Sequence, residues 1–314
     1  MRQLPWPGAD ATCGKTSSMQ QGARLIETLP TLSVICTTRN RAEELRRTCR
    51  AIRGLRPEPL EIIITADGCE DDTIDVIHNE LPHARVIVND QSMGSVASRD
   101  RMIREARGDL VLTLDDDSYP EQSDCIPVLQ RLFLENPSLA VATFPQRTDE
   151  YPETLDQVDF GGIRATRTYP SSGACLRSST YRSLPGYETL FVHAYEEPDY
   201  SLQCVSAGWD IHYFPGIIIR HHFSSANRNE MRTHHRHARN EIWSVLIRCP
   251  FPQVCMLIAW RLFSHARYAS GRGMSWLLAE PVWWCAALRS AGKAISRRNP
   301  LPWAGYRKWL GLPG

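Results

Sequence analysis

Short apolar runs alternate along the chain with stretches of helical spacing. The apolar runs are rich in β-branched residues and occupy 32–37, 60–65, 84–88, 109–114 and 139–144. Between them we predict helices at about 42–53, 72–81, 95–107 and 122–135. Strands that alternate with helices predict an α/β fold, with a mostly parallel sheet covered by helices on both faces.

Polar segments follow three of these predicted strands. They read TTRNR at 37–41, ADG at 66–68 and DDD at 115–117. In an open α/β sheet, ligands bind outside the carboxyl ends of the strands. We therefore expect hydroxyl, guanidinium and carboxylate groups to meet at one edge of the sheet.

Asp115, Asp116 and Asp117 place three carboxylates side by side. Two carboxylates about 6 Å apart repel by roughly 3 kcal/mol at an effective dielectric constant of 20. A divalent cation would remove that repulsion, and Mn²⁺ and Mg²⁺ favour oxygen ligands. The pleat turns Asp115 and Asp117 to one side and Asp116 to the other. We predict a Mn²⁺ or Mg²⁺ site at Asp115 and Asp117, with a solvated turn as the alternative.

The ordered motifs resemble those of the family 2 inverting glycosyltransferases, which have the GT-A fold. The resemblance runs from about residue 31 to 250. It is carried by LSVICTTRNRAEEL (32–45), EIIITADGCEDDT (61–73), NDQSMGSVASRDRMIREARGDLVLTLDDDS (89–118) and the segment 173–224. It implies a Rossmann-like GT-A sheet at 31–240, with a nucleotide-sugar half at 31–145 and an acceptor half at 146–240.

The resemblance assigns roles on the nucleotide side. Thr38 matches a threonine that contacts the nucleotide, Asp67 matches the second acid of a D-D-G-S signature, and Arg99 lies near the diphosphate. The first acid of that signature is Ala66 here, which leaves the nucleobase open. Asp100 stands where the family has an asparagine.

The same resemblance makes Asp115 and Asp117 the metal-side acids. Arg41, from the first-strand signature, and Asp116 are assigned to nucleotide binding. Whether Asp116 contacts the ribose stays open. One of His221 and His222 is expected near the metal and the diphosphate, and the sequence does not choose between them.

A second acidic cluster lies in YEEPDYSLQCVSAGW (195–209), which is predicted to be a loop followed by a helix. Pro198 suits a first helical position, and the helix dipole favours an ionised carboxylate near the helix start. The resemblance makes Glu197 the general base, with Glu196 as the reserve choice. Asp199 is expected to be a structural residue or an acceptor-side contact. The alternative is that these acids only cap the helix.

The remaining 241–314 carries seven of the nine tryptophans, together with Arg and Lys and almost no acid. We predict amphipathic helices here, which either contact a membrane surface or pack on the catalytic domain or a second subunit. The longest apolar run, 254–260, is far shorter than the roughly 20 residues that span a bilayer. Residues 1–30 are expected to form a disordered leader.

Composition adds little that is specific. The chain has 314 residues, a net charge of +1 and ten cysteines without a C-x-x-C pair. Nothing here favours a nucleic-acid partner, and scattered cysteines favour a reducing, cytoplasmic location, with contact to the inner membrane face left open.

Taken together, these features predict metal-assisted, inverting transfer of a sugar, a hexosyl group by resemblance, from a nucleotide-diphosphate sugar. The acceptor would be a hydroxyl of a carbohydrate, a lipid-linked carrier or a small molecule, and a homodimer is left open. The alternatives are a sugar-phosphate nucleotidyltransferase and a non-catalytic, metal-binding scaffold protein. The loop at 37–44 has neither the glycine nor the lysine that a nucleotidyltransferase would need.

Overall fold

A computed structural model describes residues 28–223 and 229–314. Its centre is an eight-stranded sheet in the order β3-β2-β1-β4-β9-β6-β10-β8. The strands are β1 (Leu32–Thr38), β2 (Glu61–Asp67), β3 (Arg85–Asn89), β4 (Leu110–Asp115), β6 (Leu139–Thr143), β8 (Arg164–Ala165), β9 (Gly173–Arg177) and β10 (Asp210–Tyr213). The five predicted strands and the mostly parallel sheet are confirmed. The expected leader at 1–30 lies almost entirely outside the described residues.

The sheet is not entirely parallel. β9 lies between β4 and β6 and runs antiparallel to both, and a second antiparallel pair, β10 with β8, forms the edge of the sheet. At Gly173, an added Cβ would lie 2.5 Å from the Ile219 side chain, so glycine is needed for close packing there. This strand was not among the predicted ones, although its sequence lies within the family-like segment.

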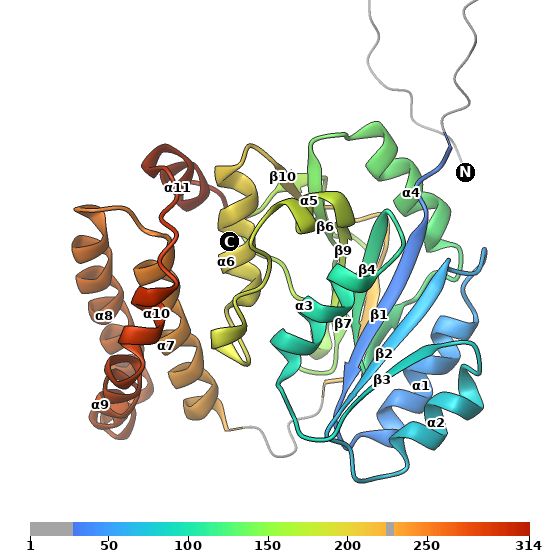
Figure 1. Ribbon diagram of the computed structural model, residues 1–314, viewed down its shortest axis with the longest axis horizontal. Helices are drawn as coiled ribbons and strands as arrows, with labels where there is room; N and C mark the ends of the chain where they lie inside the picture. Colours follow the sequence, from blue (N-terminus) through green and yellow to red (C-terminus); the bar gives the residue numbers. More distant parts are fainter. Residues whose placement is uncertain (1–27, 224–228) are drawn as a thin grey trace, which may run out of the picture.

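Helices cover both faces of the sheet (Figure 1). They are α1 (Ala42–Arg53), α2 (Thr73–Glu80), α3 (Ser95–Glu105), α4 (Cys125–Glu135), α5 (Ser178–Ser183) and α6 (Glu196–Ser206). Along β1, Val34 and Cys36 pack with α1, α2 and α4, whereas Ile35 packs with α3, α5 and α6. The two-residue period of a strand explains why a continuous apolar run fills two cores.

A small second sheet, in the order β5-β11-β7, brings a distant segment back to β4. Its strands are β5 (Ser118–Pro120), β7 (Gln146–Thr148) and β11 (Ile219–His221). β5 begins directly after the DDD segment, and β11 pairs with it so that His221 lies opposite Ser118. This pairing places a residue 100 positions away beside the acids.

The C-terminal part is helical, as predicted, and lies beyond α6 from the sheet (Figure 1). It consists of α7 (Glu230–Arg248), α8 (Gln253–Arg272), α9 (Met274–Arg289), α10 (Ala291–Ser296) and α11 (Trp303–Leu310). The domain boundary expected at residue 240 falls inside α7. None of the helices in the two described segments is long and apolar enough to cross a membrane.

Five of the seven tryptophans in this part are either buried or exposed, and the other two are half-buried. Trp243, Trp283 and Trp309 are buried, and Trp309 Nε1 donates to Arg167 O at 2.9 Å and to Ser201 Oγ at 3.1 Å. Trp260 and Trp284 are exposed. Packing against the catalytic domain and among the C-terminal helices therefore accounts for the buried tryptophans but not for the exposed ones.

Candidate functional site

A cleft of about 560 Å³ opens where β1 and β4 end side by side, with Thr37 paired to Asp115. We call it the strand-end cleft. Six of the predicted site residues line it: Thr38, Arg41, Asp67, Arg99, Asp115 and Asp116. Hydroxyl, guanidinium and carboxylate groups therefore meet at this edge of the sheet, as expected from the sequence.

β4 ends at Asp115, and Asp116 and Asp117 lie in the turn that follows. Arg41 binds both of the next two carboxylates: Nη1 lies 2.6 Å from Asp116 Oδ1 and Nη2 lies 2.7 Å from Asp117 Oδ2. Arg99 Nη2 binds Asp115 Oδ1. Two arginines thus balance much of the carboxylate charge, so the repulsion between the acids is weaker than the sequence alone indicated.

The environments of the acids shift their pKa values in opposite directions. Burial, together with the charges of Asp117 and Asp115, raises the pKa of Asp116 to about 7 against the opposing effect of Arg41. Burial also raises the pKa of Asp117, but the hydrogen bond and charge of His221 and the charge of Arg41 outweigh it, so this pKa lies below its ordinary value. Asp117 is therefore ionised at neutral pH, and its carboxylate oxygens can bind a cation.

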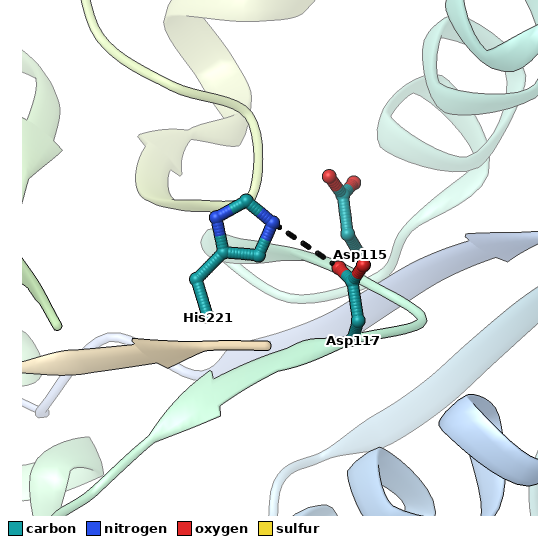
Figure 2. Close-up of side chains that lie close together, drawn as sticks. All are labelled: Asp115, Asp117 and His221. Atoms are coloured by element: carbon teal, nitrogen blue, oxygen red, sulfur yellow. Dashed lines mark ion pairs between the residues drawn. The ribbon is translucent and has the colours of Figure 1, made fainter. Parts of the chain in front are cut away.

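His221 completes a cluster with two of the acids (Figure 2). Its Nε2 lies 3.3 Å from Asp117 Oδ1, and one ligand atom each from Asp115, Asp117 and His221 lies within 4.8 Å of the others. His222 turns away, because its Nε2 lies 2.9 Å from Tyr119 Oη and its Nδ1 lies 3.5 Å from Asp149 Oδ2. Two carboxylates and an imidazole are a donor set that fits a divalent cation such as Mn²⁺.

Asp67 lines the cleft, but its carboxylate already accepts hydrogen bonds from other groups of the protein. It accepts from Asn89 Nδ2 at 2.8 Å, Ser92 Oγ at 2.6 Å, Met93 N at 2.9 Å and Gly94 N at 3.0 Å. Burial raises its pKa, but these hydrogen bonds outweigh burial and lower the pKa below its usual range. In this arrangement Asp67 shapes the loop at 89–94, which forms one wall of the cleft.

A second cavity of about 310 Å³ adjoins the first and contains Glu196 and Glu197. We call it the Glu197 pocket; it shares Arg99, Asp115 and His193 with the strand-end cleft. Ser171 holds Glu197 Oε1 with its Oγ at 2.6 Å and its N at 3.2 Å. Glu197 is half-buried, so its carboxylate is both oriented and reachable.

Glu196 differs from its neighbour. It is buried, and Arg99 Nη1 lies 3.4 Å from its Oε1. Burial and the adjacent Glu197 raise the pKa of Glu196 to about 8, although Arg99 opposes the shift. At neutral pH this side chain is largely protonated, which suits a base less well than Glu197.

Asp199 lies below the pocket in the protein core. Arg248 Nη2 binds its Oδ2 at 3.0 Å, and Ser244 Oγ donates to its Oδ1 at 2.7 Å. Gln203 Nε2 donates to Oδ2 at 2.8 Å. These contacts fix α6 to α7, in line with the structural role expected for this acid.

The wall between the two cavities has a strained backbone. Val192, Ala194 and Tyr195 have φ values of 63°, 72° and 73°, a region that residues other than glycine rarely adopt. Asn240 Nδ2 in α7 donates to the carbonyls of Phe191 at 3.1 Å, His193 at 2.9 Å and Ala194 at 2.8 Å. The distant helix therefore holds the strained segment 191–195.

Sequence reasoning missed this support. No motif marks Asn240. The sequence just before it, 232–239, is rich in His and Arg. Arg236 and Arg239 from that stretch do line the strand-end cleft. His234 instead binds Glu280, with Nε2 2.9 Å from Oε1.

Comparison with known proteins agrees with this geometry. The family model described as "Glycosyl transferase family 2" matches residues 33–185. The uncharacterized glycosyltransferase YwdF of Bacillus subtilis is 26% identical over 208 residues, which cover 63% of this chain and 76% of YwdF. The pre-mycofactocin glycosyltransferase of Mycobacterium tuberculosis is 26% identical over 209 residues, which cover 60% of this chain but only 42% of that protein.

Among solved structures, the mannosyltransferase PcManGT of Pyrobaculum calidifontis, in complex with GDP-Man and Mn²⁺, has a similar fold. Its TM-score is 0.56 at 15% identity, and the match covers 90% of this chain and 84% of that one. This likeness concerns the fold, whereas the sequence matches concern the family. Both agree with the ordered strand-end motifs and support a family 2 glycosyltransferase.

Proposed function

We propose that the chain transfers a sugar from a nucleotide-diphosphate sugar in the strand-end cleft to an acceptor hydroxyl in the Glu197 pocket, with inversion at the anomeric carbon. The observation that carries the proposal is that the two cavities adjoin each other. They share Arg99, Asp115 and His193, with the acids on one side and Glu197 on the other.

Asp115, Asp117 and His221 would hold the cation, and their mixed oxygen and nitrogen donors suit Mn²⁺ better than Mg²⁺. When bound, the cation would stabilise negative charge on the leaving diphosphate. PcManGT was solved with GDP-Man and Mn²⁺, which supports the same pairing here. Arg236 and Arg239 are positioned to contact the diphosphate oxygens from the opposite wall.

In the proposed reaction, Glu197 takes the proton of the acceptor hydroxyl while that oxygen bonds to the anomeric carbon. The bond from this carbon to the diphosphate oxygen breaks, and the electron pair leaves with the nucleoside diphosphate. Ser171 orients the Glu197 carboxylate, and one displacement from the side opposite the diphosphate inverts the configuration. The hydroxyl belongs to a carbohydrate, a lipid-linked carrier or a small molecule.

A thermal-shift screen of UDP, GDP, dTDP and CDP, each with and without Mn²⁺, tests the donor half of the proposal. A ligand that binds only the folded chain stabilises it by RT ln(1 + [L]/Kd), so the preferred nucleotide gives the largest shift. Asp117→Ala is expected to abolish the Mn²⁺-dependent part, whereas Glu197→Gln keeps it.

Release of nucleoside diphosphate from the matching nucleotide-sugar then tests the catalytic half. Both variants are expected to lower turnover by at least about tenfold, a loss typical of a removed general base or a lost charge contact. Glu153→Gln, an exposed acid outside both cavities, serves as the control. Unchanged turnover in both variants, or release of pyrophosphate from a nucleoside triphosphate, would contradict the proposal.

A further inference from the structure

The outer side of α8 carries an exposed apolar stripe. Met256, Trp260 and Phe263 lie four and three residues apart, which places them on one face of the helix. Their exposed fractions are 57–61%. A helix on the surface of a globular protein normally turns such a face inward. Here, Val254 and Leu257 form the inward face, so α8 is apolar on both sides.

The neighbouring helix α9 repeats this pattern. Met274, Leu278, Val282 and Leu288 are 64–75% exposed and follow one another at near-helical spacing. The opposite side of α9 packs inward through Trp283. Single exposed apolar residues need no explanation, but two adjacent helices with apolar outer stripes form a surface suited to binding. We call these two stripes the α8–α9 face.

Positive charge accompanies this face. From Gln253 to Ser296 the only acid is Glu280, which is buried and bonded to His234 and Trp283. The basic residues in the same span are Arg261, Arg267, Arg272, Arg289 and Lys293. Arg267 lies four residues beyond Phe263 and Arg289 next to Leu288, so both stripes end at an exposed arginine.

We propose that the α8–α9 face docks on a bilayer surface that contains anionic lipid. Apolar side chains with tryptophan and flanking arginines match the boundary between acyl chains and anionic head groups. A second copy of the chain is a poorer occupant, because a two-fold contact would set the same basic side chains against each other. α8 lies on the membrane and does not cross it.

The inner side of the docked helix is joined to the Glu197 pocket. Arg261 Nε and His265 Nε2 in α8 bind Glu241, at 3.1 Å and 2.7 Å. Tyr195 Oη, which belongs to the strained segment, donates to the same Glu241 at 3.0 Å. Docking therefore places the pocket at a fixed position relative to the lipid surface.

Co-sedimentation with vesicles tests this inference without any activity measurement. The probes are vesicles of phosphatidylcholine alone and of phosphatidylcholine with phosphatidylglycerol. The wild-type chain is expected to bind the anionic vesicles, and raising the salt from about 0.1 M to about 1 M is expected to weaken binding. Trp260→Ser combined with Phe263→Ser and Leu278→Ser is expected to lower the partition coefficient at least about tenfold.

Two further variants make the test specific. Val158→Ser combined with Ile163→Ser removes exposed apolar side chains elsewhere and should bind like wild type. Arg267→Gln combined with Arg289→Gln should weaken binding only to anionic vesicles, and it keeps the inference testable if the triple variant fails to fold. Absent wild-type binding, or unchanged binding by both sets of variants, overturns the proposal. So does a wild-type dimer in light scattering that becomes monomeric in the triple variant without any lipid binding.

Discussion

The strand-end cleft and the Glu197 pocket touch each other but are built in different ways. The cleft rests on adjacent strands β1 and β4, and its acids are bound by arginines within 76 residues along the chain. The pocket rests on the strained segment 191–195 and the start of α6, which α7 supports from 45 to 49 positions away. The cleft is thus part of the sheet, whereas the pocket depends on a helical region that the sheet does not need.

This contrast predicts that damage to α6 and α7 disturbs the pocket more than the cleft. The largest effect is expected for Asp199→Ala. It leaves Arg248 buried without its partner, which costs about 3–5 kcal/mol of unfolding free energy. Guanidinium denaturation measures the loss, and Asp156→Ala, at an exposed site, is the control. A loss below about 1 kcal/mol would mean that α6 does not depend on this pair.

Asn240→Ala is expected to come next. Three carbonyls of the strained segment lose their donor, at a cost of about 2 kcal/mol in stability. Because the segment borders Glu197, kcat should fall about tenfold or more while the nucleotide thermal shift stays unchanged. Asn240→Asp has the same shape but no N–H donors, so it should resemble the alanine variant; wild-type kcat in Asn240→Asp would rule out the hydrogen bonds as the cause.

On the cleft side, Arg41→Lys is expected to have the opposite signature. A lysine cannot hold Asp116 and Asp117 together, so nucleotide affinity in the presence of Mn²⁺ should fall about tenfold. At saturating donor, kcat should change little. Arg47→Lys, on the exposed side of α1, is the control for titration calorimetry. A fall in kcat without any loss of nucleotide affinity would contradict this prediction, because it would show that Arg41 acts in the transfer step and not in nucleotide binding.

The smallest effect concerns the pH dependence of stability. The folded-state pKa of Glu196 is raised to about 8 from 4.5, so between these values the folded chain holds a proton that the unfolded chain has lost. The unfolding free energy therefore falls as pH rises through this window, and Glu196→Gln should flatten the decline. Melting temperatures of the wild-type chain and the variant at pH 5 and pH 8 measure this decline. An equally steep decline in the variant would show that Glu196 does not cause it.

The sequence predicted the strand-end cleft well, and the reason is local. Strands of β-branched residues and helical spacing between them determine which residues end each strand, so Thr38, Arg41, Asp115 and Asp116 meet as expected. The choice between His221 and His222 required the pairing of β11 with β5, which no local pattern encodes. The repulsion between the three carboxylates depends on their contacts with Arg41 and Arg99, which are also a tertiary feature.

The support of the Glu197 pocket could not be predicted for a related reason. Positive φ values at Val192, Ala194 and Tyr195 run against the preferences of those residues, so sequence propensity points away from the observed backbone. Ser171 and Asn240 are common polar residues without a distinguishing neighbour pattern. Only the fold brings them to Glu197 and to the carbonyls of the strained segment.

The continuity of α7 has a consequence for how this protein can be divided. The family-matched segment, 33–185, contains Arg41, Arg99 and the three adjacent acids but ends before Glu197 and before α7 with Arg236, Arg239 and Asn240. A recombinant fragment cut at residue 240 would keep the part of the cleft that the sheet carries and sever the helix that shapes the pocket. Exchanging the helical tail between relatives would therefore alter the choice of acceptor and leave the choice of donor in place.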